Sequence, residues 1–251
     1  MIHLHNLRPR LLNQGRRMLT RYLARRLFVR STSTPYISFT FDDFPRSSFL
    51  TGAPLLDELG VKGTFFVSMG LLDTESPMGR IATRDDLRSL LKKGHELGCH
   101  TFDHLDGWST DPMVFEQSVT KNWDSLNLFL PPYYPRVFAY PLDGPRPRTK
   151  RIIGKHFLCC RGGGQTFNKG VIDLYLLNAC FLDWRNRDDI RSIRRLIDQN
   201  NGVGGWLIFA THDITTEPSR YGCTPGFFGE VVRYACQSEA HVLPIAKVCN
   251  E

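Results

Sequence analysis

The stretch YISFTFDD, residues 36–43, decides the fold class of this chain. Its first six residues are mostly aromatic or β-branched, and the run stops at two adjacent acids, Asp42 and Asp43. Residues of these types favour extended backbone, and a short run bounded by polar residues predicts a buried β-strand. The segments that follow decide what kind of sheet this strand joins.

Short apolar runs alternate with longer amphipathic segments through the rest of the chain. Further strands are predicted at 63–68, 95–101, 136–141, 156–163, within 174–184, at 206–213 and at 241–248. Helices are predicted at 53–59, 83–93, 112–130, 188–199 and 227–238. Strands separated by helices at this interval imply parallel pairing through right-handed crossovers. We therefore expect one α/β domain over residues 35–251, built as a barrel or an open barrel-like sheet.

Residues 1–34 differ from the rest and are predicted to form a basic amphipathic helix. Residues 1–30 hold eight arginines and no acidic residue. The larger apolar side chains fall near one side of such a helix: Leu12, Leu19, Leu23 and Phe28. Three interpretations stay open, namely a helix packed on the domain with solvated arginines, contact with an anionic membrane surface, and an organelle transit peptide.

The net charge of +7 comes from that segment alone. Without its eight arginines, 24 of the 32 basic residues remain against 25 acidic residues, so the body of the protein is balanced and no nucleic-acid partner is expected. No apolar run approaches the roughly 18 to 20 residues that span a bilayer. Seven cysteines without a CxxC pair or a secretory signal indicate reduced thiols. We expect a cytoplasmic protein, with peripheral contact at the inner face of the membrane through residues 1–30.

Acids and histidines follow directly after five of the predicted strands. These strand ends read TFDD (Asp42, Asp43), HTFDH (His100, His104), AYPLDG (Tyr140, Pro141, Leu142), LDW (Asp183, Trp184) and THD (His212). In a parallel barrel the carboxyl ends of the strands meet at one face, where the catalytic groups of such folds lie. The sequence therefore predicts one polar site built from five segments.

The residue types at these strand ends predict metal-assisted hydrolysis. His100 and His104 can present two imidazole nitrogens to one cation, and a carboxylate from Asp42 or Asp43 completes the set. Adjacent residues of an extended chain point opposite ways, so the other aspartate is free to act as a general base. On the opposite side, His212 can protonate a leaving group. Asp183 is then a natural partner to fix the tautomer of His212 and raise its pKa.

These five motifs, in this order and with these gaps, resemble those of the polysaccharide deacetylases, the NodB-homology domain of carbohydrate esterase family four. The resemblance spans about residues 36–248. It implies a distorted (β/α)7 barrel that hydrolyses an N-acetyl, or sometimes an O-acetyl, group of an amino sugar. It further implies a divalent metal ion, foremost zinc, with cobalt, nickel or manganese as alternatives.

The resemblance also implies a role for each site residue. Asp42 corresponds to the general base, and Asp43, His100 and His104 correspond to the metal ligands. His212 corresponds to the acid that protonates the departing amine, with Asp183 as the residue that orients it.

Four further positions complete the implied site. Thr101 corresponds to a hydroxyl that braces the two-histidine loop, and Trp184 to a wall of the acetyl pocket. Tyr140 and Pro141 lie in the third motif, on the substrate and oxyanion side of the implied site, and the backbone N–H of Leu142 corresponds to an oxyanion donor.

The third motif departs from the pattern of many members of the family, which place there an arginine paired with the catalytic aspartate. Here the motif reads Ala139-Tyr140-Pro141-Leu142, with Arg161 or Arg46 as a substitute arginine. The expected substrate is an acetylated amino sugar, lipid-linked or nucleotide-activated. Two alternatives are a hydrolase of another non-peptide C–N bond, of the deformylase or ureide type, and a catalytically silent sugar-binding homologue.

Overall fold

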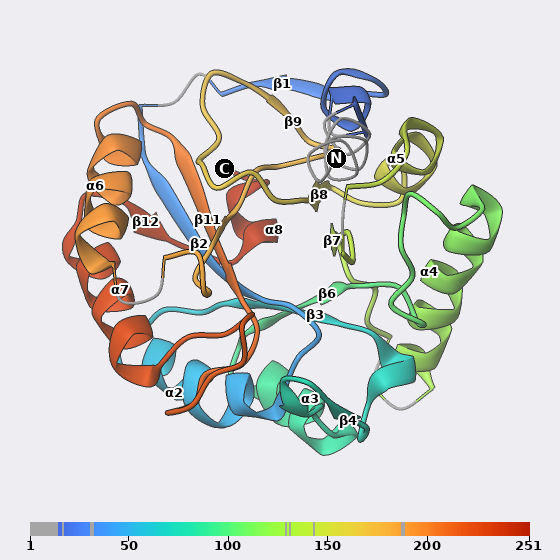
Figure 1. Ribbon diagram of the computed structural model, residues 1–251, viewed down its shortest axis with the longest axis horizontal. Helices are drawn as coiled ribbons and strands as arrows, with labels where there is room; N and C mark the ends of the chain where they lie inside the picture. Colours follow the sequence, from blue (N-terminus) through green and yellow to red (C-terminus); the bar gives the residue numbers. More distant parts are fainter. Residues whose placement is uncertain are drawn as a thin grey trace, which may run out of the picture.

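The computed structural model describes residues 15–16, 18–30, 33–128, 130, 132–142, 144–186 and 189–251 (Figure 1). Within these residues, seven strands pair in parallel in the order β10-β11-β2-β3-β6-β7-β8, and β12 pairs with the first residues of β2. The strands of this sheet are β2 (Tyr36–Phe41), β3 (Thr64–Val67), β6 (Glu96–Cys99), β7 (Val137–Ala139), β8 (Cys159–Arg161), β10 (Cys180–Phe181), β11 (Trp206–Thr211) and β12 (His241–Val242). The parallel α/β architecture predicted from the sequence is confirmed.

Helices surround the curled sheet on its outer side, except the last one, which lies within the ring of strands in this view (Figure 1). They are α2 (Ala53–Asp57), α3 (Arg84–Lys92), α4 (Pro112–Asn127), α5 (Pro147–Gly154), α6 (Ile190–Asn201), α7 (Pro225–Gln237) and α8 (Ile245–Val248). Short turns of π-helix (Ser48–Gly52) and 3₁₀-helix (Met69–Leu71) and a small hairpin of β4 (Glu75–Ser76) and β5 (Gly79–Arg80) lie between them. Among the described helices, none combines the length and apolar character needed to cross a membrane.

Strand β2 is the centre of the sheet, and all six of its residues are buried. Its aromatic rings stack on those of the two neighbouring strands. Phe39 lies 5.4 Å from Phe209 of β11, and Phe41 lies 4.3 Å from Phe65 of β3, measured between ring centroids. Burial of such rings is the main favourable term in folding. This packing fixes β2, so Asp42 and Asp43 leave the sheet from a fully buried strand.

The sheet does not close on itself, because its edge strands β8 and β10 do not pair with each other. The segment 174–179 covers the free edge of β8 instead. The N–H of Cys160 donates to the carbonyl oxygen of Leu174 at 2.8 Å, and the N–H of Leu177 donates to that of Cys160 at 2.8 Å. Outside this seam, β1 (Leu27–Val29) and β9 (Val171–Asp173) form a separate antiparallel pair. The predicted distorted barrel is thus open along one side.

The predicted N-terminal helix is only partly correct. Helical backbone is present at residues 18–22, whereas Leu27–Val29 form β1. The aromatic and β-branched side chains at 28 and 29, together with the free edge of β9, favour strand pairing there. Leu19, Leu23 and Phe28 are about half exposed rather than packed on the domain, and Leu12 lies outside the described residues.

Two other elements differ from the prediction. The last strand was expected at 241–248, but it ends at Val242, and helix α8 follows Pro244. Proline lacks the N–H that a continued ladder requires, and its fixed φ suits a helix start. Helix α5 was not predicted, although Pro147 at its first position is a typical start signal.

Helix α3 begins at the predicted cap, Thr83. The Thr83 hydroxyl accepts from the N–H of Asp86 at 3.1 Å, and the Asp86 carboxylate accepts from the N–H of Thr83 at 2.9 Å. We expect Thr83→Ala to lower the free energy of unfolding by about 1 kcal/mol, because the helix start loses this reciprocal cap. Urea unfolding measures the change. The matched control Thr120→Ala, on the exposed face of α4, should cause no loss, and equal effects of both variants would contradict the cap's role.

Candidate metal and catalytic site

Loops with unusual backbone geometry follow the strands that carry the predicted site. Eight described non-glycine residues have a positive φ, and five of them lie in these loops: Asp43 (59°), Phe44 (57°), Thr101 (61°), His104 (52°) and Leu142 (58°). The left-handed region costs roughly 1–3 kcal/mol for such residues and persists only where the surroundings enforce it. Strain is therefore concentrated where the sequence places the chemistry.

Asp43, His100 and His104 converge on one point, as predicted for metal ligands. Asp43 Oδ1 lies 3.0 Å from His104 Nε2 and 3.4 Å from His100 Nε2, and one ligand atom from each residue lies within 4.8 Å of the others. Ligands about 2 Å from a tetrahedral zinc ion are roughly 3.3 Å apart. Asp43 Oδ1 is also buried and accepts no hydrogen bond from the described residues. The three side chains fit a divalent ion.

The two histidines are held in the orientation that a metal requires. His100 Nδ1 contacts the carbonyl oxygen of Ala139 at 2.8 Å, which places the proton on Nδ1 and leaves the Nε2 lone pair facing Asp43. The Thr101 hydroxyl accepts from the N–H of Leu105 at 3.1 Å and closes the loop that carries both histidines. The bracing role expected of Thr101 agrees with this contact.

The charges of the triad are mutually dependent. Burial disfavours the charge on Asp43, but the adjacent imidazole of His104 and the nearby His100 and His212 hold the pKa of this carboxyl below its usual range. Burial lowers the pKa of His100 to about 4, so its imidazole is neutral near pH 7. Burial also opposes the charge on His104, but Asp43 raises the pKa of this imidazole. A carboxylate beside a neutral imidazole is the state in which such side chains bind a cation.

Asp42 is paired with Arg161, one of the two arginines named from the sequence. Arg161 Nη2 donates to Asp42 Oδ1 at 2.5 Å, and both side chains are almost fully buried. The guanidinium lies between the rings of Phe66 and Phe181, 5.2 and 5.4 Å from their centroids. Arg46, the other arginine named, binds Asp86 at 3.0 Å instead. Arg161 therefore pairs with Asp42 from β8, the strand that follows the third motif.

His212 lies across the site from the triad ligands, with Nε2 3.8 Å from Asp43 Oδ2. The predicted pairing of His212 with Asp183 is wrong. Asp183 binds the guanidinium of Arg185 through both oxygens, at 2.6 to 3.0 Å, whereas His212 Nδ1 contacts the carbonyl oxygen of Tyr221 at 3.2 Å. Arg185, two residues after Asp183, satisfies that carboxylate locally. The backbone carbonyl of Tyr221, rather than a carboxylate, orients the His212 ring. A backbone partner of this kind cannot be recognised from a side-chain motif.

The residues predicted to face the substrate divide into two groups. Leu142 is 72% exposed and Trp184 is 52% exposed, so both are open to a ligand. Tyr140 is 4% exposed and its ring packs 5.0 Å from that of Phe138, while Pro141 is buried. Residues two apart on an extended chain share a face, so Tyr140 follows Phe138 into the apolar layer beneath α4 and α5. Its predicted contact with substrate is therefore wrong.

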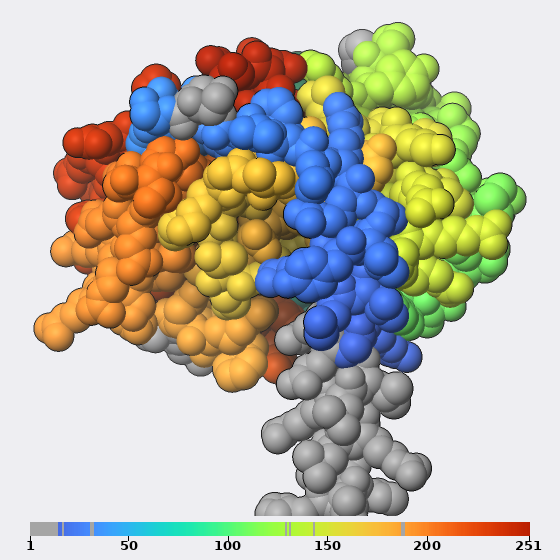
Figure 2. All heavy atoms as spheres, turned by 90° about the horizontal axis from the view of Figure 1, so that it is seen from above, coloured from blue at the N-terminus to red at the C-terminus, as the bar shows by residue number. Residues whose placement is uncertain are grey.

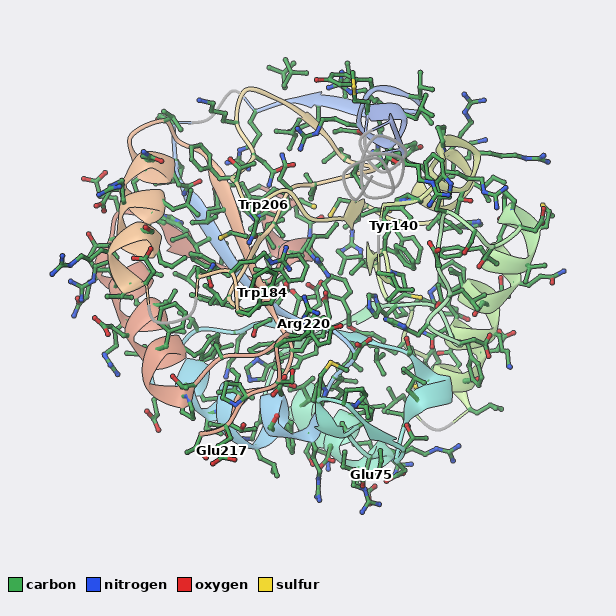
Figure 3. All side chains as sticks on the ribbon, viewed as in Figure 1. Glu75, Tyr140, Trp184, Trp206, Glu217 and Arg220 are labelled. Atoms are coloured by element: carbon green, nitrogen blue, oxygen red, sulfur yellow. The ribbon has the colours of Figure 1, made fainter. Side chains whose placement is uncertain are left out.

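Trp184, Arg220 and Tyr221 form an exposed rim beside the site. Only Trp184 was predicted from the sequence. The Arg220 guanidinium lies 5.3 Å from the centre of the Trp184 ring and 5.5 Å from that of Tyr221. Figure 3 shows Trp184 and Arg220 beside each other near the middle of the view, with Tyr140 apart from them. Arg220 and Tyr221 lie in the loop after the THD motif, and only their proximity to His212 marks them as site residues.

Comparisons with solved structures agree with this fold. A peptidoglycan N-acetylglucosamine deacetylase is 17% identical, with a TM-score of 0.61, covering 88% of this chain and 90% of that one. A family 4 acetyl xylan esterase from Clostridium thermocellum, solved with a cobalt ion, is 18% identical, with a TM-score of 0.57 and coverage of 86% and 90%. A CE4-family pseudoenzyme from Bacillus anthracis is 13% identical, with a TM-score of 0.59 and coverage of 86% and 66%. At these identities the likeness is one of fold.

The sequence itself also matches a family. No curated protein matches the chain. The profile of the polysaccharide deacetylases, however, matches residues 29–156, which is just over half of the 251 residues and includes the TFDD, HTFDH and third motifs. The chain belongs to the polysaccharide deacetylase family.

Proposed function

We propose that this protein is a metal-dependent hydrolase that removes an N-acetyl, or an O-acetyl, group from an amino sugar of a glycan. The observation that carries the proposal is the arrangement of Asp42 with Arg161 directly beside the triad of Asp43, His100 and His104. A base held next to a three-ligand cation site is what hydrolysis of an amide requires.

The ion proposed for the triad is zinc, which favours imidazole and carboxylate ligands in a three-residue site with open positions. When bound, it would act as a Lewis acid toward the acyl carbonyl and lower the pKa of water. Asp42 accepts the proton of the attacking water through the carboxylate that Arg161 orients. Arg161 holds Asp42 in place through a buried ion pair beside the triad.

Two groups serve the later part of the reaction. The N–H of Leu142 donates no hydrogen bond to any described residue and lies on a strained, exposed turn, so it is free to donate to the developing oxyanion. His212 delivers a proton from Nε2 to the departing amine, while its Nδ1–H donates to the carbonyl oxygen of Tyr221.

Two alternatives from the sequence stay distinguishable by experiment. A silent sugar-binding homologue is opposed by the complete set of base, ligands and acid at the site. A hydrolase of another C–N bond would share this machinery and differ in the side chains that contact the acyl group.

A substrate panel separates these functions. We expect zinc-loaded protein to release acetate from an N-acetylated chitooligosaccharide or from a nucleotide-activated N-acetylamino sugar, and to leave a formylated amino sugar and a ureide unchanged. Preferential turnover of the formyl or ureide compound would support the second alternative. Saturable sugar binding without any turnover across the panel would support the silent homologue.

A further inference from the structure

An apolar surface without a covering element lies on the N-terminal segment. Eight of the 18 large apolar side chains that are exposed among the described residues gather there. This N-terminal surface comprises Met18, Leu19, Tyr22, Leu23, Leu27, Phe28, Val29 and Val171. Scattered exposed apolar residues need no explanation, but eight within one short segment and the strand paired with it indicate an interaction site.

The strand pair of β1 and β9 gives part of this surface a defined shape. Val29 is directly opposite Val171 in the antiparallel register, and Leu27 is two residues from Val29. These three side chains therefore share one face of the pair, and they are 55% to 64% exposed. Figure 2 shows the segment in blue, on the outside of the domain beside the yellow residues around 150–175.

The segment is fixed to the domain by a buried lysine. Lys150 Nζ donates to the carbonyl oxygens of Thr20 at 2.7 Å and Leu23 at 3.1 Å, and to Asp173 Oδ2 at 2.6 Å. The Thr20 hydroxyl donates to the carbonyl oxygen of Pro145 at 2.7 Å. Because Lys150 is fully buried, these contacts hold the exposed apolar side chains in one place.

The charge around this surface has one sign. Residues 1–30 contain no acid, and the arginines at 21, 25 and 26 are exposed. Asp173, the acid of β9, is already paired with Lys150 at 2.6 Å and approached by Arg25 at 4.0 Å. Exposed apolar side chains beside several arginines, with the nearby acid Asp173 already paired with Lys150, match the interface of an anionic bilayer.

We propose that the N-terminal surface docks on an anionic lipid bilayer. The apolar face of β1 and β9 enters the interface, and the arginines contact lipid phosphates. The same segment contacts two loops of the domain, because Arg16 lies 5.2 Å from the centre of the Trp108 ring in the loop after β6, and Thr20 binds Pro145 in the loop after β7. Docking therefore holds the loops that follow β6 and β7 close to the membrane.

Vesicle sedimentation of the full chain tests this docking without any measurement of activity. The parent should bind vesicles of phosphatidylglycerol and phosphatidylcholine, bind phosphatidylcholine alone far more weakly, and lose binding as salt is raised. The triple variant Leu27→Thr, Val29→Thr, Val171→Thr keeps β-branched strand residues and should bind at least about tenfold more weakly. The matched control Val114→Thr, Leu128→Thr, Val203→Thr changes exposed side chains elsewhere and should bind as the parent does.

Circular dichroism of both triple variants establishes that each is folded. Equal binding by the two variants, or no binding by the parent, would overturn the proposal. The proposal would also be overturned if the parent self-associated without binding vesicles and only the first triple variant abolished that self-association. The surface would then bind a second copy of the chain. Binding to heparin in place of vesicles would likewise overturn it. Vesicle binding is measured without any assay of acetate release. A negative result in one experiment therefore does not decide the other proposal.

Discussion

Asp42→Asn should lower acetate release by about 10²- to 10⁴-fold, the range that a positioned general base contributes. Asparagine keeps the shape of the side chain and can still contact Arg161, but it cannot accept the proton of the attacking water. Asp43, His100 and His104 are unchanged in this variant, so the protein should still bind one equivalent of zinc. Initial rates and metal analysis of the same sample measure both quantities.

The control for this variant is Asp85→Asn, an isosteric change at a carboxylate whose side chain is 87% exposed. It should leave both turnover and zinc content unchanged. If Asp42→Asn retained full turnover, Asp42 would not be the base. If it lost zinc together with turnover, Asp42 rather than Asp43 would belong to the ligand set.

Arg161→Met should lower the free energy of unfolding by about 3–5 kcal/mol, because it leaves the buried carboxylate of Asp42 without a partner. Methionine fills much of the same volume between Phe66 and Phe181, so lost packing adds little to the effect. The double variant with Asp42→Asn should recover a large part of the loss, since neither buried charge then remains. Urea unfolding of the parent and the three variants gives the coupling between the two residues.

An exposed pair provides the comparison for Arg161. Arg80 binds Asp73 at 3.4 Å with both side chains about half exposed, and Arg80→Met should change stability by no more than about 1 kcal/mol. Equal losses for Arg161→Met and Arg80→Met would show that burial does not make the Asp42–Arg161 pair important for the fold.

The strands and the position of the site were predictable because each rests on local pattern. YISFTF and WLIFAT are short, strongly apolar runs, and their ends are marked by TFDD and THD. Parallel strands bring their carboxyl ends to one edge whatever the details of packing. For that reason the meeting of His100 and His104 with Asp42 or Asp43 followed from chain order, and the resemblance to the deacetylases singled out Asp43 as the ligand.

The partners of individual side chains were not predictable in the same way. Arg161 reaches Asp42 across 119 residues of sequence only because the curl of the sheet carries β8 toward β2. Asp183 does not pair with His212, because Arg185, only two residues away in sequence, binds its carboxylate. Tyr140 lies on the same face of the extended chain as Phe138 and packs against it, so its side chain does not face the site.

The N-terminal segment shows the same limit. An amphipathic pattern of leucines predicted a helix, but the free edge of β9 offers backbone hydrogen bonds to Leu27–Val29 that no local pattern contains. Likewise, the buried position of Lys150 depends on Asp173 and on two carbonyl groups contributed from a distant part of the chain.

Titration of metal-free protein with zinc, followed by acetate release from an N-acetylated chitooligosaccharide, tests the central claim most directly. The arrangement of Asp43, His100 and His104 predicts no turnover without metal and a rise that reaches its plateau at one equivalent of zinc. His104→Ala removes the most accessible of the three ligands and should abolish that plateau. Acetate release that is the same before and after removal of the metal would contradict a metal-dependent deacetylase at this site.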